Sequence, residues 1–166
     1  GDIFDRGPYA DKIMDLLMNY HSLDFEWGNH DILWMGAAAG NQACIANVVK
    51  NNLRHHNTEI LESGYGISLR ELALFAEKTY ANVEPMEAAD KAVSVMLLKL
   101  EGQTIQRHPE YGMNDRLLLS KINKEAKTVE INGKEYPLKD GDFPTLQSED
   151  AYALTEEEAH VMDELT

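Results

Sequence analysis

The sequence opens on Gly1-Asp2-Ile3-Phe4-Asp5-Arg6-Gly7, and a second glycine-led motif follows at Gly28-Asn29-His30-Asp31. Each motif joins a tight turn to polar side chains that a plain loop would not need. Their carboxylate and amide oxygens are hard ligands for a divalent metal, and the imidazole can donate a proton. The guanidinium of Arg6 is a planar fork suited to a phosphate. Brought together at neighbouring strand ends, these groups indicate phosphoester hydrolysis.

The residues around the two motifs predict an α/β fold. Pro8 stands where helices begin, and the apolar residues from Ile13 to Tyr20 recur at helical spacing. We expect a short strand at Leu23–Trp27, and a second helix in the charge-free stretch from Ile32 to Val49. That stretch contains three polar amides and many small alanines, so it suits a helix inside a protein better than a membrane span.

The sequence from residue 57 onward predicts mostly helix. Ser68 with Glu71 is a capping-box pattern, and a longer helix is expected from Pro85 to a stop at Pro109. Local patterns predict three further elements: a short helix capped by Asn114 and holding Leu117 and Leu118, a β-hairpin at Thr128–Leu138 around Asn132-Gly133, and a final helix from Thr155 and Glu158 to Leu165.

Composition excludes several classes of partner. The chain has 166 residues, and 15 Lys and Arg against 29 Asp and Glu leave a net charge of −14. Attraction to a phosphate backbone or an anionic lipid surface therefore cannot organise binding, so we expect no nucleic acid and no membrane. The single cysteine, Cys44, cannot form an intramolecular disulfide, which favours a reducing compartment, the cytoplasm.

The two motifs, read as GDxxDRG and GNHD, resemble the second and third motifs of the metallophosphoesterase superfamily. Five longer runs extend the likeness over nearly the whole chain, and together they resemble class III fructose-1,6-bisphosphatase, the bacterial gluconeogenic type. These runs are GNHDILWMGAAAG from residue 28, KLEGQ at 99–103, RHPEYGMNDRLLL at 107–119, and GKEYPL at 133–138 with DFPT at 142–145.

The resemblance implies hydrolysis of fructose 1,6-bisphosphate to fructose 6-phosphate and phosphate at a two-metal centre, with manganese as the metal. It also implies that residues 1–56 are a slice of a four-layer αββα sandwich that forms the catalytic core. Residues 57–166 would then be a mostly helical accessory region with one hairpin. The residues by themselves indicate only a hard, oxygen-preferring divalent ion.

Carried over position by position, the resemblance assigns two metal ligands and four catalytic residues. Asp2 would bridge the metals, and Asn29 would bind one of them through its side-chain oxygen. His30 would protonate the leaving alkoxide. The other roles fall to three charged residues: Asp5 would orient the imidazole, Arg6 would hold the phosphate oxygens, and Asp31 would steady Arg6.

The superfamily pattern also includes an earlier Asp-x-His motif and two later metal-binding histidines, which have no counterpart here. We therefore expect a fragment that is inactive by itself. Two alternatives stay open: hydrolysis of a phosphoprotein or dinucleoside polyphosphate by the same chemistry, and a non-catalytic role for residues 57–166 in assembly, for example into a homo-oligomer.

Overall fold

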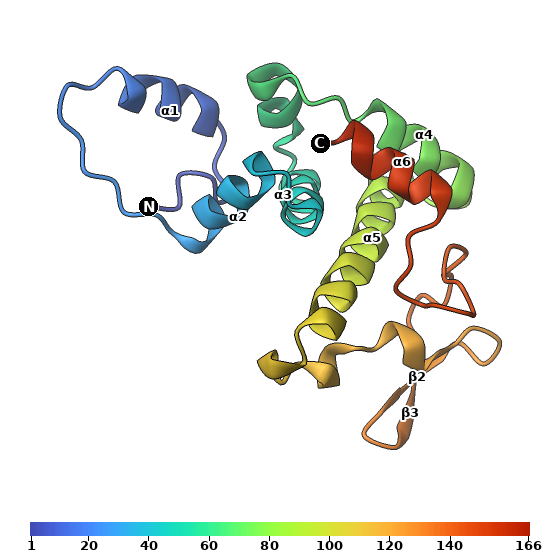
Figure 1. The fold of residues 1–166 in the computed structure, drawn as a ribbon. Coiled ribbons are helices and arrows are strands. Elements are labelled where there is room, and N and C mark those ends of the chain that lie inside the picture. Colours follow the sequence, from blue (N-terminus) through green and yellow to red (C-terminus); the bar gives the residue numbers. More distant parts are fainter.

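The computed structural model describes all of residues 1–166 as a mostly helical chain with one small sheet (Figure 1). No helix combines the length and the apolar content needed to cross a bilayer. The α-helices are α1 (Ala10–Met18), α2 (Asn29–Ala38), α3 (Gln42–Arg54), α4 (Arg70–Thr79), α5 (Pro85–Arg107) and α6 (Glu156–Glu164). The shorter elements are a π-helical turn, η1 (Ile60–Gly64), the 3₁₀ turns η2 (Pro109–Tyr111), η3 (Asn114–Arg116) and η4 (Leu119–Lys121), and the strands β1 (Ile122–Asn123), β2 (Thr128–Ile131) and β3 (Lys134–Pro137).

The long helix α5 is the centre of the main core. Helices α3 and α4 pack on it, α2 packs on α3, and α6 packs on α4 (Figure 1). Ala89, Val93, Met96, Leu97 and Leu100 of α5 lie in this core, whereas Met86 in its first turn is exposed. Pro85 begins the helix as predicted, because its missing N–H is not needed in the first turn.

The sheet forms at the predicted Asn-Gly turn. Asn132 and Gly133 have φ angles of 53° and 75°, both left-handed, as a two-residue hairpin turn requires. The turn pairs β2 with β3 in antiparallel register, with Ile131 opposite Lys134. No sequence pattern predicted the third strand, β1, which adds only two residues beside β2.

The strand expected at Leu23–Trp27 does not form, so the prediction of α/β architecture for the first part of the chain is wrong at this element. Residues 23–28 form no regular secondary structure and pair with no strand, and the one sheet of the structure lies in residues 122–137. A strand is stabilised by hydrogen bonds to a neighbour, and these residues have none beside them. The four-layer sandwich is accordingly not present within residues 1–166.

The charge-free stretch forms two helices where one was expected. The break lies at Gly40, whose φ of 81° is left-handed, and the Asn41 side chain then caps α3 by accepting a hydrogen bond from the Cys44 N–H at 3.0 Å. Gly36 lets α2 and α3 approach, because a Cβ there would lie 2.6 Å from Cys44 Sγ.

Of the three predicted caps, one forms fully, one in part and one not at all. At α4 the Ser68 hydroxyl accepts a hydrogen bond from the Arg70 N–H at 3.3 Å, but the Glu71 side chain accepts from the Arg70 guanidinium instead of returning to the backbone, so the box is incomplete. Asn114 caps no helix, and the turn there is 3₁₀ and ends before Leu117. At α6 both halves of the box are present, since Thr155 accepts from the Glu158 N–H at 3.1 Å and Glu158 Oε2 accepts from the Thr155 N–H at 2.8 Å.

Candidate functional site

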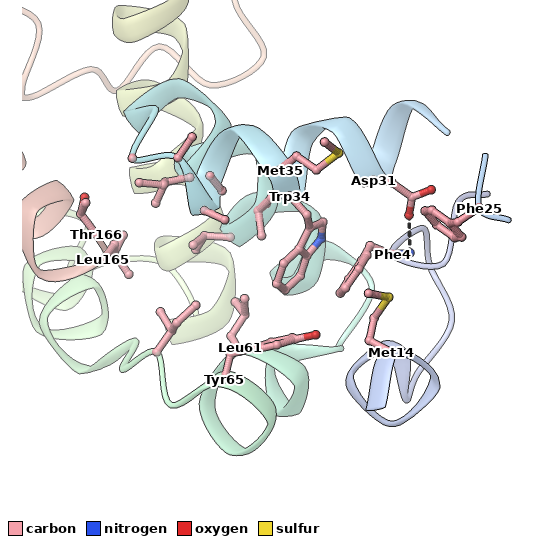
Figure 2. A pocket seen from close by; sticks show the side chains of 18 residues that line it. Phe4, Met14, Phe25, Asp31, Trp34, Met35, Leu61, Tyr65, Leu165 and Thr166 are labelled. Carbon is pink, nitrogen blue, oxygen red and sulfur yellow. Dashed lines mark hydrogen bonds between the residues drawn. The ribbon is translucent and has the colours of Figure 1, made fainter. Parts of the chain in front are cut away.

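Asp31 joins the two predicted motifs. It lies in the first turn of α2 and is 3% exposed. Its Oδ2 accepts hydrogen bonds from the backbone N–H of Gly28 at 2.8 Å and of Asp2 at 2.5 Å, and its Oδ1 accepts from the Phe4 N–H at 3.3 Å (Figure 2). One carboxylate thus holds residues 2–4 of the first motif against the helix that carries the second.

The same hydrogen bonds set the pKa of Asp31. Burial acts to raise the pKa of this carboxyl, but the backbone N–H groups of Gly28, Phe4 and Asp2 favour the charged form. Together these hydrogen bonds outweigh burial and hold the pKa of Asp31 below its ordinary value of 3.8. Asp31 is therefore a charged structural anchor of the motif loop.

Asp2 lies against the start of α2. Its backbone is left-handed, with φ at 56°, and its Oδ1 accepts a hydrogen bond from the His30 backbone N–H at 3.1 Å. A Cβ at Gly28 would overlap the Asp2 carboxylate, so only glycine allows this approach. The glycine of the second motif therefore makes room for the aspartate of the first.

The side chains of His30 and Asp5 are in contact. The Nε2 of His30 lies 3.0 Å from Asp5 Oδ1, and the imidazole is 22% exposed while the carboxylate is 43% exposed. The pair joins the two motifs a second time, now through side chains. Such a contact orients an imidazole and determines which of its nitrogens is left to exchange a proton.

Arg6 is not steadied by Asp31. Its guanidinium is 70% exposed, and its ion pair is with Asp5, whose Oδ1 lies 3.6 Å from Nε. Asp31 bonds to backbone N–H groups instead, because they lie within its reach at the buried start of α2. That part of the predicted arrangement is wrong, although Asp31 does hold the loop that carries Arg6.

Asp2 and Asn29 are hard oxygen donors, as a divalent metal such as manganese prefers. The Asn29 side chain is exposed and makes no hydrogen bond, and Asp2 uses only Oδ1 in one. Nowhere in residues 1–166 do three His, Cys, Asp or Glu side chains come together to hold a metal ion. The donors therefore fit a metal in kind, but they do not complete a coordination shell.

An apolar pocket of about 820 Å³ lies beside the motif loop (Figure 2). Phe4 stacks on Trp34 with ring centroids 4.4 Å apart, and Tyr65 lies 5.4 Å from Trp34 and 6.3 Å from Phe4. Asp31 is the one charged residue in the pocket wall, and neither His30 nor Arg6 lines it. The polar site and this pocket therefore share Asp31, but the His30 and Arg6 side chains belong only to the polar site.

Sequence reasoning missed one residue that contacts the motif loop. Asn57, at the start of the segment between α3 and α4, donates a hydrogen bond from Nδ2 to the backbone oxygen of Arg6 at 2.7 Å. An asparagine soon after a helix end is usually explained by local turns, so its sequence context carried no signal for this contact.

Comparison with known proteins identifies the family. All of residues 1–166 match the model of the Firmicute fructose-1,6-bisphosphatase family. Proteins named fructose-1,6-bisphosphatase class 3 are 48% identical in Listeria innocua and 48% identical in Phocaeicola vulgatus, over 100% and 99% of this chain. The chain spans 28% of the length of each relative. No solved structure matches it. The chain belongs to the Firmicute fructose-1,6-bisphosphatase family.

Proposed function

We propose that these residues form part of the active site of a metal-dependent fructose-1,6-bisphosphatase. The observation that carries the proposal is the contact of Asp5 with His30 beside Asp2, since it gathers an acid, its orienting partner and a metal-type donor from two motifs. Family membership supports fructose 1,6-bisphosphate as substrate over a phosphoprotein or a dinucleoside polyphosphate.

In the proposed reaction, water attacks the 1-phosphate and the bond between phosphorus and the sugar oxygen breaks. His30 gives a proton to that oxygen, which leaves as the hydroxyl of fructose 6-phosphate, and phosphate is released. Because Nε2 is paired with Asp5, Nδ1 is the nitrogen left for this transfer. Arg6, exposed beside the pair, supplies a guanidinium for the phosphate oxygens.

Asp2 and Asn29 would hold the metal, for which manganese is the proposed identity. A divalent metal would polarise the phosphate and stabilise its developing charge. Two protein donors are too few for tight binding, so the 166-residue chain by itself should neither retain a metal nor turn over substrate. We assign residues 1–56 to the catalytic core, within a four-layer αββα sandwich in the complete enzyme, and residues 57–166 to a helical accessory region.

The test replaces the matching segment of the Listeria innocua relative with residues 1–166, and this hybrid is called the chimera below. With manganese, the purified chimera should release phosphate from fructose 1,6-bisphosphate, and the unmodified relative is the positive control. A folded chimera that leaves this sugar untouched but hydrolyses a phosphopeptide or a dinucleoside polyphosphate would overturn the substrate assignment.

An assembly role for residues 57–166 is a separate proposal. The size of the chimera in solution would be measured by light scattering over a range of concentrations. A strictly monomeric chimera with full activity would remove any need for assembly.

A further inference from the structure

The segment of residues 57–65, between α3 and α4, contacts the motif loop independently of Asp31. Its first residue, Asn57, bonds to the Arg6 backbone, and its last, Tyr65, lies against Phe4 and Trp34 (Figure 2). The accessory region therefore touches the loop at two points.

Asn57 is presented from a fixed backbone. Its N–H donates to the Asn52 oxygen at 2.9 Å, and its own oxygen accepts from the Ile60 N–H at 3.1 Å. The π-helical turn η1 begins at Ile60, which is buried. The amide Nδ2 that reaches Arg6 is therefore held by α3 on one side and by η1 on the other.

Arg6 depends on such an anchor because its side chain has little support of its own. Its side chain is 70% exposed, and its one ion pair, with Asp5, is long at 3.6 Å and open to solvent. Asp31 holds the loop only as far as Phe4. Beyond Phe4, the hydrogen bond from Asn57 to the Arg6 oxygen is the side-chain contact that fixes the peptide from which the guanidinium projects.

From this geometry we infer that Asn57 is a positioning residue for Arg6: it holds the arginine peptide so that the guanidinium meets the phosphate of the substrate. This inference rests on the proposed function for the role of Arg6. The link between Asn57 and the loop itself can be measured without any activity.

The informative substitution is Asn57→Asp, which keeps the size of the side chain but removes the N–H donor. Asn51→Asp is the matched control, since it makes the same chemical change in α3, where Asn51 Nδ2 donates only to Asn47 Oδ1 at 3.0 Å. Asn57→Gln retains an N–H donor on a longer side chain and should keep part of the positioning of Arg6 that Asn57→Asp loses.

The first measurement uses the 166-residue chain without metal or substrate. In carbon-13 NMR, the Arg6 carbonyl resonance should shift in Asn57→Asp and stay in place in Asn51→Asp. Circular dichroism of both variants reports whether the helices are retained. An unchanged Arg6 resonance in a folded Asn57→Asp chain would overturn the inference.

The second measurement uses the chimera with manganese and inorganic phosphate. Asn57→Asp should raise the inhibition constant of phosphate about tenfold, the size expected for one lost hydrogen bond. A merely structural role would lower the amount of active enzyme, so kcat would fall with the inhibition constant unchanged, and that result would also overturn the inference.

The two proposals fail differently. If the unmodified chimera releases no phosphate from the sugar, the proposed function fails, and phosphate binding by calorimetry replaces inhibition as the readout for Asn57. If the unmodified chimera is active but its Asn57→Asp variant binds phosphate equally tightly, only the positioning role of Asn57 fails.

Discussion

Asp5 Oδ1 lies 3.0 Å from His30 Nε2, although the two residues belong to different motifs. The contact needs the loop of residues 1–7 to lie across the start of α2, where Asp31 ties it to the helix. The imidazole and the carboxylate are therefore brought together by the docking of a loop on a helix, and not by either motif alone.

This pair predicts a non-additive loss of turnover. In the chimera, His30→Ala should lower kcat by about 10²–10⁴, as for a lost general acid, and leave the metal content unchanged. Asp5→Asn should cost less alone and add little on top of His30→Ala, because its orienting role needs the imidazole. Steady-state kinetics with metal analysis by mass spectrometry would check this. Full activity in His30→Ala would show that another group protonates the leaving oxygen.

Asp31 predicts a pH-dependent contribution to stability. Its folded pKa is lowered, so the charged form favours the folded state, and its contribution is complete above the ordinary value of 3.8. As the pH falls below 3.8 toward the lower folded pKa, that contribution is lost. At pH 7, Asp31→Asn should destabilise the chain by about 1.5–3 kcal/mol, and this difference should shrink only as the pH falls below 3.8.

The measurement for Asp31 is urea unfolding of the 166-residue chain and the variant from pH 7 to pH 3. Asp24→Asn, a substitution at an exposed position of the segment between α1 and α2, is the control and should leave stability unchanged. A deficit for Asp31→Asn that stays constant down to pH 3 would contradict the role assigned to its charge.

The buried ion pair of Lys99 and Glu158 predicts a large loss of stability when one partner is removed and a smaller loss when both are replaced. Nζ lies 2.6 Å from Oε2, both side chains are at most 1% exposed, and Nζ also donates to the Thr145 oxygen at 2.8 Å. Lys99→Met would leave a buried carboxylate without its partner and should cost about 3–5 kcal/mol. Lys99→Met combined with Glu158→Gln should cost less, because no charge is then stranded.

An exposed pair whose glutamate neighbours Glu158 in α6 is the natural control. Lys78 Nζ also lies 2.6 Å from its partner, Glu157, but these side chains are 68% and 57% exposed. Lys78→Met should therefore change the free energy of unfolding by no more than about 1 kcal/mol. Equal losses of unfolding free energy in Lys78→Met and Lys99→Met would show that burial does not determine how much each ion pair contributes to stability.

A side chain added at Gly102 should overpack the interface between α5 and Tyr152. Gly102 lies inside α5, where a Cβ would overlap the ring of Tyr152, which also receives a 2.8 Å hydrogen bond from Gln103 on its backbone oxygen. Gly102→Ala gains about 1 kcal/mol of helix propensity but overpacks the contact, for a net loss of about 1–2 kcal/mol. In a Tyr152→Leu background the same change should be neutral or stabilising, which thermal unfolding of the four chains would test.

The elements that the sequence predicted well are specified by neighbours in the chain. Asn132-Gly133 turns the hairpin by its own left-handed backbone, Pro85 starts α5, and Thr155 with Glu158 caps α6. Each signal acts within a few residues, so it holds wherever the segment lies in the fold. The catalytic and metal-binding roles of the motif residues remain predictions, although the contact of His30 with Asp5 is present.

Predictions failed where the outcome depends on a distant partner. Leu23–Trp27 has the composition of a strand, but no other strand lies beside it. The break at Gly40 divides the charge-free stretch because α2 and α3 pack on each other around Gly36. Helical periodicity could indicate the helices, but not the packing that made two of them.

The sequence by itself determined the family likeness, the chemical character of the two motifs and the local signals that begin, turn and cap the helices and the hairpin. Only the tertiary structure decided that Asp31 bonds to backbone N–H groups, that Asn57 holds a peptide 51 residues away, and that Lys99 meets a carboxylate 59 residues along the chain. The physical reason is that a buried polar group must find a partner in space, and chain folding determines which group lies there.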